Sequence, residues 1–458
     1  MILITFPRHF LPERQYTIDI LMGEILGLDY RSEPKPQQDY EILLENGNKL
    51  IIKDGFFSLI SNGGSYLKEN WLPGRVRYIK NQFTRGRDIP VLYGTQPMEI
   101  TDRQIECRID VVAAVFFMLS RWEEYVIRTR DMHQRFPATA SLAFKNGFLD
   151  RPIVDEYAEM VWQMLKYLGC QQQRKNHPFT FVLTHDVDAL LKWLDWNHVL
   201  RTAAGDILKR RQYRTALSRV HEYKKIAGKK MKDPFDTYDW LMDLSESLHL
   251  KSHFYFKSSE LSKVPEDNRS PYPLRHRKTS EIFARIKKRG HIIGFHPGYD
   301  TYQNESLWEQ QKKQLAEACG SRITCGRQHY LRFEVPYTWQ LWENQHMEID
   351  STCGYADREG YRCGTGHAFT VFNILTRKPL KLKEQPLIFM DKRNFSCGGY
   401  SGTSLFEHNL TRIIDSARTF NTPVTLLFHN QTFEDNAFVQ MYEEIIKMGH
   451  PGSINETR

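Results

Sequence analysis

Acidic and histidine side chains follow several apolar runs of this chain, in an order suited to metal-assisted hydrolysis. Residues 179–183 (Phe-Thr-Phe-Val-Leu) are apolar, β-branched and aromatic, which predicts a buried strand. Asp186 and Asp188 follow it, and alternate residues of an extended segment point to the same side. In parallel α/β folds, sites are built at the carboxyl ends of strands. The alternative is a turn whose aspartate caps the next helix.

A second group combines a histidine with an acid. A predicted helix over 281–289 ends at Gly290, and residues 291–295 then predict a short strand that delivers His296 and Asp300. Imidazole suits zinc and related divalent metals, and a carboxylate is compatible with zinc, manganese or cobalt. A hydrogen-bonded turn histidine is the alternative interpretation of this pair.

Two further residues could support acid–base chemistry. Arg327, in the run Arg-Gln-His-Tyr, would favour the charged form of Asp186 if the two lie close together. His429 ends the apolar run 423–428, and a histidine titrates close enough to neutrality to donate a proton to a departing amine.

Together these runs resemble the motifs of the polysaccharide deacetylases, the carbohydrate esterase family 4 or NodB homology group, over about residues 178–435. Residues 184–188 (Thr-His-Asp-Val-Asp) are similar to the Thr-Phe-Asp-Asp-Gly motif of that family. The resemblance implies that Asp186 is the general base and Asp188 a metal ligand. Residues 290–296 (Gly-His-Ile-Ile-Gly-Phe-His) are similar to the stretch that leads into the second motif, which implies that His296 is a metal ligand.

The chain departs from the family pattern at the third ligand. The second ligand histidine of the family would fall at Asp300, so Asp300 is expected to bind the metal. The alternatives are that His329 takes its place or that the metal is held weakly. The implied cofactor is a divalent metal, Zn²⁺ first, with Mn²⁺ or Co²⁺ also compatible.

The remaining motifs imply further roles. Residues 327–330 resemble the Arg-Pro-Pro-Tyr motif, whose arginine pairs with the base and whose next backbone N–H, near Tyr330, faces the oxyanion. Asp350 stands where the family has an aspartate that orients the catalytic histidine, although the usual tryptophan is missing. His429 matches the Leu-x-Leu-x-His motif and is implied to be the general acid.

The resemblance implies an α/β fold, a distorted (β/α) barrel of the NodB type, over residues 176–450. The chain has 458 residues, 41% of them hydrophobic, which is enough for two cores. Residues 1–175 are predicted to form a smaller α+β domain with short strands at 41–44 and 49–52. Its role is not predicted. Arg121, Glu123 and Glu124 are expected on a solvated helix face, and the alternative is that they face the catalytic cleft.

A basic helical insertion is expected at about residues 190–250. The segment 201–232 holds eleven Lys and Arg against two acids, a net charge of +9, whereas the whole chain carries +8. Such a helix could lie on an anionic membrane surface or bind a phosphorylated glycolipid, and a solvated helix is the alternative. Nucleic-acid binding is not expected, because no reading motif accompanies the charge.

Arg362 lies in a loop flanked by Gly360 and Gly364 and is a candidate contact for an anionic sugar, although a structural turn explains the pattern equally well.

The sequence also suggests a compartment. Residues 1–8 look like a strand and not a leader, and no run approaches the roughly 18 apolar residues of a membrane span. We therefore expect a cytoplasmic protein, with peripheral attachment to the inner membrane surface through the basic segment. Seven scattered cysteines without a Cys-x-x-Cys pair predict reduced thiols.

Three functions follow from these observations. The first is a metal-dependent hydrolase that removes N-acetyl groups from an amino sugar of a surface polysaccharide, a lipopolysaccharide or a lipid-linked precursor. The second is a non-catalytic glycan-binding protein on a degenerate deacetylase fold, motivated by Asp300 where histidine is usual. The third is another C–N amidase, of the allantoinase type.

Overall fold

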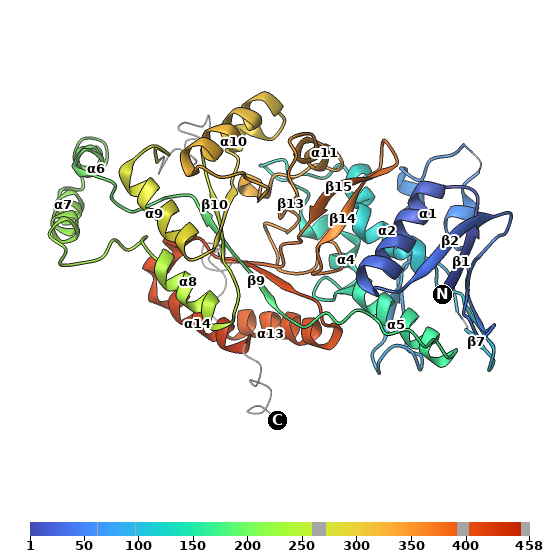
Figure 1. The fold of residues 1–458 in the computed structure, drawn as a ribbon. Helices are drawn as coiled ribbons and strands as arrows, with labels where there is room; N and C mark the ends of the chain where they lie inside the picture. Colours follow the sequence, from blue (N-terminus) through green and yellow to red (C-terminus); the bar gives the residue numbers. More distant parts are fainter. Residues whose placement is uncertain (62, 97, 259–271, 392–402, 450–458) are drawn as a thin grey trace. The chain divides into compact units, whose positions relative to one another are not determined.

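The chain has a mixed α/β fold that divides into two compact units (Figure 1). The computed structural model describes residues 1–61, 63–96, 98–258, 272–391 and 403–449. Unit 1 comprises Met1–Thr180, Tyr330–Phe389 and Arg393–Thr425, and unit 2 comprises Phe181–His329, Met390–Lys392 and Leu426–Arg458. This division differs from the two contiguous domains expected from the sequence, because unit 1 also takes in segments that follow unit 2 in the chain.

Packing explains why a late segment belongs to unit 1. The ring of Phe372 lies 4.9 Å from that of Tyr16 and 5.5 Å from that of Phe116, and the Tyr16 hydroxyl donates to the Thr370 carbonyl at 2.8 Å. Long-range aromatic contacts of this kind cannot be read from the order of the motifs.

Unit 1 contains a six-stranded sheet in the order β2-β1-β3-β4-β8-β7. β1 pairs in parallel with β2, and β4 with β8, whereas the other neighbours are antiparallel. The strands predicted at 41–44 and 49–52 are β3 and β4, joined by the turn at Asn46-Gly47. The strands are β1 (Ile2–Pro7), β2 (Tyr30–Lys35), β3 (Tyr40–Leu43), β4 (Lys49–Ile52), β7 (Glu99–Ile100) and β8 (Gln104–Cys107).

The core of unit 1 is built around α2 (Val111–Ser120), all ten residues of which are buried. Asp110 caps this helix, since its carboxylate accepts the Ala113 N–H at 2.9 Å. Further elements are α1 (Leu11–Ile18), η1 (Asp19–Ile25), β5 (Arg77–Ile79), β6 (Ile89–Val91), α3 (Trp122–Val126), α4 (Leu142–Lys145), α5 (Ile153–Tyr167), α11 (Tyr337–Asn344), β13 (Ile349–Asp350), β14 (Phe369–Asn373), β15 (Lys378–Glu384) and α13 (Thr403–Phe420).

Unit 2 is built on parallel strands in the order β12-β11-β10-β9, with helices between successive strands. Alternating strands and helices produce a parallel arrangement of this kind. The elements are β9 (Phe181–Val187), α6 (Trp196–Leu208), α7 (Tyr213–Ala227), α8 (Tyr238–Ser247), β10 (His253–Phe256), α9 (Arg277–Lys288), β11 (Ile292–Phe295), α10 (Glu305–Cys319), β12 (Cys325–Gly326) and α14 (Asn436–Met448).

Two short strands from late in the sequence contribute residues to unit 2. β16 (Phe389–Met390) and β17 (Val424–Leu427) cross the limit between the units. Within unit 2, the Phe428 N–H donates to the Thr184 carbonyl at 3.1 Å, and the Asp391 N–H donates to the Leu427 carbonyl at 3.0 Å. Residues 391, 427 and 428 are thereby aligned with the end of β9.

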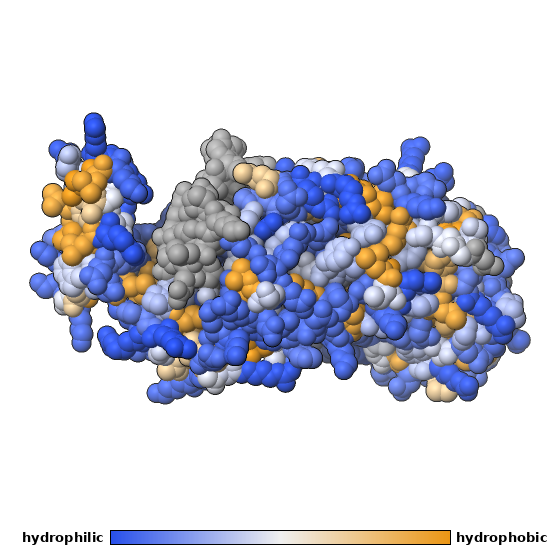
Figure 2. Space-filling model, turned by 90° about the horizontal axis from the view of Figure 1, so that it is seen from above, coloured by the Kyte–Doolittle hydropathy of each residue, from blue (hydrophilic) through white to orange (hydrophobic). Residues whose placement is uncertain are grey.

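The predicted basic insertion contains α6, α7 and α8. The first two form a helical hairpin that projects away from the other helices of unit 2 (Figure 1), and apolar residues gather on one side of it (Figure 2). In the described part of the chain, no helix combines the length and apolar character needed to cross a bilayer. No disulfide joins the six cysteines that the structure describes.

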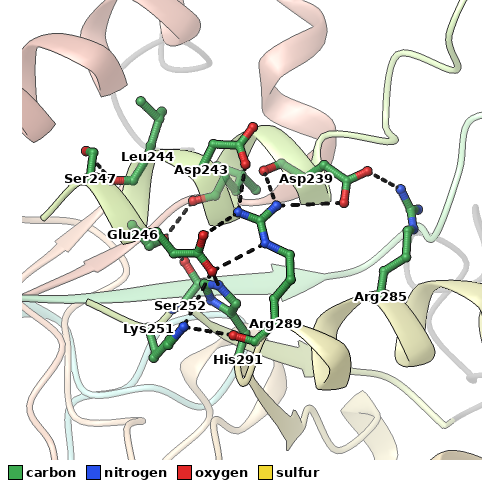
Figure 3. A network of polar contacts seen from close by, with 12 residues as sticks. Asp239, Asp243, Leu244, Glu246, Ser247, Lys251, Ser252, Arg285, Arg289 and His291 are labelled. Carbon is green, nitrogen blue, oxygen red and sulfur yellow. Dashed lines mark hydrogen bonds and ion pairs between the residues drawn. The ribbon is translucent and has the colours of Figure 1, made fainter. Parts of the chain in front are cut away.

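A polar network fixes α8 and α9 against the beginnings of β10 and β11 (Figure 3). The Arg289 guanidinium reaches Asp243 and Glu246, both at 2.7 Å. Glu246 lies 3.1 Å from His291 Nε2, and the Ser252 N–H donates to His291 Nδ1 at 2.9 Å. These contacts fix the starting points of β10 and of β11, the strand that His296 follows.

Candidate metal and catalytic site

The candidate site lies at the carboxyl ends of the unit 2 strands. Asp186 belongs to β9, and Asp188 comes directly after it. His296 follows β11, Arg327 follows β12, and His429 follows the segment aligned with β9. The ends of parallel strands meet at one edge, which brings side chains from distant parts of the sequence together.

Three of these side chains could hold a metal ion. One ligand atom each from Asp188, His296 and His329 lies within 4.8 Å of the other two. Asp188 Oδ1 is 3.5 Å from His296 Nε2 and 3.2 Å from His329 Nε2. One carboxylate and two imidazoles form a ligand set suited to zinc, which in catalytic sites takes three protein ligands and a water or substrate.

The orientation of His296 fits a metal ligand. Its Nδ1 lies 2.7 Å from the Arg327 carbonyl oxygen and donates to it, so Nε2 is the ring nitrogen that could bind a metal. Nε2 is buried and has no hydrogen-bond partner in the described part of the chain. A buried acceptor directed at two carboxylates is explained by a cation between them.

Asp300, the expected third ligand, does not belong to this cluster, in which His329 stands beside Asp188 and His296. After Pro297 and Gly298 the chain forms a short 3₁₀ turn, Tyr299–Thr301, in which Asp300 is partly exposed. The Gly298 N–H is held by the Gln311 side chain at 2.8 Å. His329 was the alternative ligand in the sequence, and it comes from the end of the neighbouring strand.

Asp186 is a buried carboxylate paired with a buried arginine. Arg327 Nη1 donates to Asp186 Oδ1 at 2.8 Å, and its guanidinium lies 5.0 Å from the centre of the Tyr255 ring. Burial alone would raise the pKa of Asp186, but the charges of Arg327, His296 and His429 outweigh burial and hold that pKa below its ordinary value. The carboxylate is therefore charged at neutral pH.

His429 is oriented by an acid that the motifs did not identify. Its Nδ1 lies 2.7 Å from Asp391 Oδ1, and its backbone N–H donates to Asp391 Oδ2, also at 2.7 Å. This pairing directs Nε2 towards Asp188, whose Oδ2 lies 3.7 Å away. Asp391 ends the apolar run 387–390, so the pattern of an acid after an apolar strand could have indicated it.

Asp350, which was expected to orient the histidine, belongs to unit 1. There its carboxylate accepts the Thr352 N–H at 3.1 Å. The acid that contacts His429 is Asp391, so the expected assignment is corrected.

Tyr330 begins the second segment of unit 1 and has a left-handed backbone (φ 60). Its carbonyl accepts a hydrogen bond from Arg135 at 2.9 Å. The role of its N–H in binding an oxyanion stays a prediction.

Arg362, the candidate sugar contact, is buried in unit 1. Its guanidinium makes two hydrogen bonds to Glu124, one of them at 2.8 Å, and donates to the Gly354 carbonyl at 2.7 Å. Arg121 also donates to Glu124 at 2.9 Å. Burial would raise the pKa of Glu124, but the two arginines lower it to about 2.

The prediction that the Arg121, Glu123 and Glu124 side chains face solvent is therefore wrong. All three are at most 3% exposed, since Arg362 supplies a second cation that allows the acids to be buried. Arg362 has a structural role.

Comparisons with known proteins do not assign a function to this site. Residues 2–169 match a family described as "Family of unknown function (DUF7033)". No curated protein matches the chain. Among solved structures, the chain is similar to a "putative polysaccharide deacetylase from Mycobacterium smegmatis", with 14% identity and a TM-score of 0.34 over 62% of this chain and 96% of the other. A similarity this low assigns neither fold nor function.

Proposed function

We propose that this protein is a metal-dependent hydrolase that removes N-acetyl groups from an amino sugar of a surface polysaccharide, a lipopolysaccharide or a lipid-linked precursor. The observation that carries the proposal is the Asp188, His296 and His329 cluster beside two further pairs, Asp186 with Arg327 and His429 with Asp391. Ligands, a base and an acid are the parts that metal-assisted amide hydrolysis requires. The sugar substrate is inferred from the resemblance of the motifs.

Asp188, His296 and His329 would hold the ion, and zinc matches these donors best. When bound, such an ion supplies Lewis-acid polarisation of a carbonyl and a water that loses its proton near neutral pH.

Asp186 is assigned as the general base. A base must be deprotonated at the working pH, and the Arg327 ion pair keeps the carboxylate charged despite its burial. One oxygen of Asp186 pairs with Arg327, and the other lies 3.7 Å from His296 Nε2, on the side of the ligand cluster. Arg327 therefore orients the base as well as stabilising its charge.

His429 is assigned as the general acid. With Nδ1 hydrogen-bonded to Asp391, Nε2 is the nitrogen that can transfer a proton to the departing amine. Asp391 fixes the orientation of the ring, in the same way as the acid of a hydrolase triad.

We also infer that β9 to β12 and their helices belong to a distorted (β/α) barrel of the NodB type. Four parallel strands with intervening helices, and a site at their carboxyl ends, support this inference.

The proposal is tested by measuring acetate release from oligomers of N-acetylglucosamine and from N-acetylated glycolipid precursors, with zinc-reconstituted protein. Asp186→Asn is expected to lower turnover about 10²–10⁴-fold while the protein keeps its metal, because the base is lost and the ligands are not. Glu305→Gln, at the start of α10, is the matched carboxylate control and should act as wild type. Unchanged acetate release in Asp186→Asn would overturn the proposal.

A further inference from the structure

The α6–α7 hairpin is held together by its own small core. Trp193, Val199 and Tyr223 are buried against one another, and Val220 and Ile226 pack on them. These contacts account for the inward faces of both helices. The apolar residues that remain outside are therefore not needed to keep the two helices paired.

Large apolar side chains are exposed along the outer surface of the hairpin. Leu208 is 80% exposed and Leu217 is 71% exposed. On α6, Leu200 and Ile207 are exposed as well, and an offset of seven residues brings them within about 20° of one another around the helix. The ring of Trp196 instead packs on Tyr223 of α7, with 4.7 Å between the ring centres. Tyr213 lies one helical turn before Leu217 on α7 and is also exposed. Figure 2 shows apolar residues gathered on the visible face of the projecting hairpin, with hydrophilic residues around them.

The two acidic residues of the hairpin already have partners in this part of the chain. Asp206 is buried and forms ion pairs with Arg210 and Arg219. Glu222 contacts Lys192 at 2.7 Å and accepts the indole N–H of Trp193 at 2.9 Å. Neither acid is available to neutralise the rest of the segment.

Nine cations of the segment are exposed, and none of their side chains forms an ion pair within the described residues. They are Arg201, Lys209, Arg211, Arg214, Lys224, Lys225, Lys229, Lys230 and Lys232. An anionic lipid bilayer fits both kinds of residue, because its headgroups attract the cations and its hydrocarbon layer accepts the exposed leucines. A polyanion such as a nucleic acid would use the cations but has no comparable use for the leucines.

We propose that the α6–α7 hairpin docks the protein on an anionic lipid bilayer, with Leu208 and Leu217 entering the interface and the nine cations facing the headgroups. α6 begins shortly after Asp188 in the chain, so the docking element is joined directly to the strand that carries the candidate base and a candidate ligand. The proposal does not depend on the hydrolase assignment, because its readout is lipid binding and not turnover.

The test is co-sedimentation of the full-length protein with vesicles of phosphatidylcholine alone and of phosphatidylcholine mixed with phosphatidylglycerol. Binding is expected only to the mixed vesicles, and it should be lost at 1 M salt, where the screening length falls to about 3 Å. This comparison needs no variant. Absence of binding to mixed vesicles at low salt would overturn the proposal.

Two sets of variants then test whether the exposed leucines and the lysines of the hairpin contribute to vesicle binding. Leu208→Ser with Leu217→Ser should lower the partition coefficient at least about tenfold, and each of Lys224→Gln and Lys225→Gln should lower it about fivefold. Leu59→Ser, Lys378→Gln and Lys381→Gln change exposed residues of unit 1 and should bind as wild type. Helix content by circular dichroism confirms that the hairpin variants are folded.

Three results would contradict the proposal. The first is vesicle binding that is unchanged in the leucine variants, since charge alone would then account for it. The second is tighter binding to a mixed-sequence oligonucleotide than to the vesicles. The third is a wild-type dimer in sedimentation equilibrium that the leucine variants convert to a monomer, because the apolar side would then be covered by a second copy.

Discussion

Asp391 holds His429 at two points, through the ring Nδ1 and through the backbone N–H, both at 2.7 Å. One carboxylate thereby fixes the position of the main chain and the tautomer of the ring. Nδ1 donates to Asp391, and Nε2 faces the ligand cluster, where it can transfer a proton once the ring carries a second one.

Asp391→Asn should therefore lower turnover without removing the metal. An amide can hydrogen-bond to the ring in the wrong tautomer and carries no charge, and the corresponding change in a hydrolase triad lowers the rate about 10⁴-fold. We expect a loss of about 10²–10⁴-fold in kcat with unchanged metal content. Asp350→Asn is the comparison variant. A large loss in that variant and none in Asp391→Asn would restore the assignment made from the sequence.

The acid limb of the pH–activity profile should depend on the ion pair between Asp186 and Arg327. In Arg327→Met the main charge that opposes burial is removed, so the pKa of Asp186 rises. The base is active when deprotonated, and a higher pKa moves the acid limb of the kcat/KM profile to higher pH, by about 1–3 units. The neighbouring Arg332, which donates to the His133 carbonyl at 3.0 Å, provides the control Arg332→Met. An unmoved acid limb in Arg327→Met would contradict the assignment of Asp186 as base.

Arg362 is expected to matter for stability. Arg362→Met removes one of the two cations that hold Glu124 inside unit 1, and breaking a buried pair from one side costs about 3–5 kcal/mol of unfolding free energy. Denaturant unfolding measures the loss, and adding Glu124→Gln to the variant should recover part of it. If stability were unchanged and only KM rose, Arg362 would be a substrate contact after all.

His185 should make the protein less stable in acid. Burial lowers the pKa of its imidazole to about 3, against an unfolded value near 6.5. As the pH falls, the unfolded chain therefore binds a proton at this histidine before the folded protein does. The contribution of His185 to the free energy of unfolding is present above pH 6.5 and is lost as the pH falls from 6.5 to 3. The contribution is about 5 kcal/mol at most. His185→Gln should flatten this part of the curve of unfolding free energy against pH, whereas the exposed His249→Gln should not.

The parts of the site that follow a simple local rule were accessible from the sequence. The apolar run before Asp186 and Asp188 forms β9, and His296, Arg327 and His429 follow strands or strand-like segments. Buried strands that end in polar residues are local features, so one sequence is enough to predict them.

The parts that depend on long-range packing were not accessible. His329 replaces Asp300 because of the turn after Pro297, and Asp391 contacts His429 because its N–H pairs with the Leu427 carbonyl. Arg362 was interpreted as a candidate sugar contact because the acid that it binds, Glu124, lies far away in the sequence. These contacts arise between segments that no local pattern relates.

The most direct test of the account is the metal content of purified protein by elemental analysis, for wild type, His329→Ala and Asp300→Ala. We expect close to one zinc per chain in wild type and in Asp300→Ala, and loss of the metal in His329→Ala, because His329 belongs to the ligand cluster and Asp300 does not. Metal retained in His329→Ala and lost in Asp300→Ala would contradict the site described above. Wild-type protein that stays metal-free after reconstitution with zinc, manganese and cobalt would contradict the hydrolase itself.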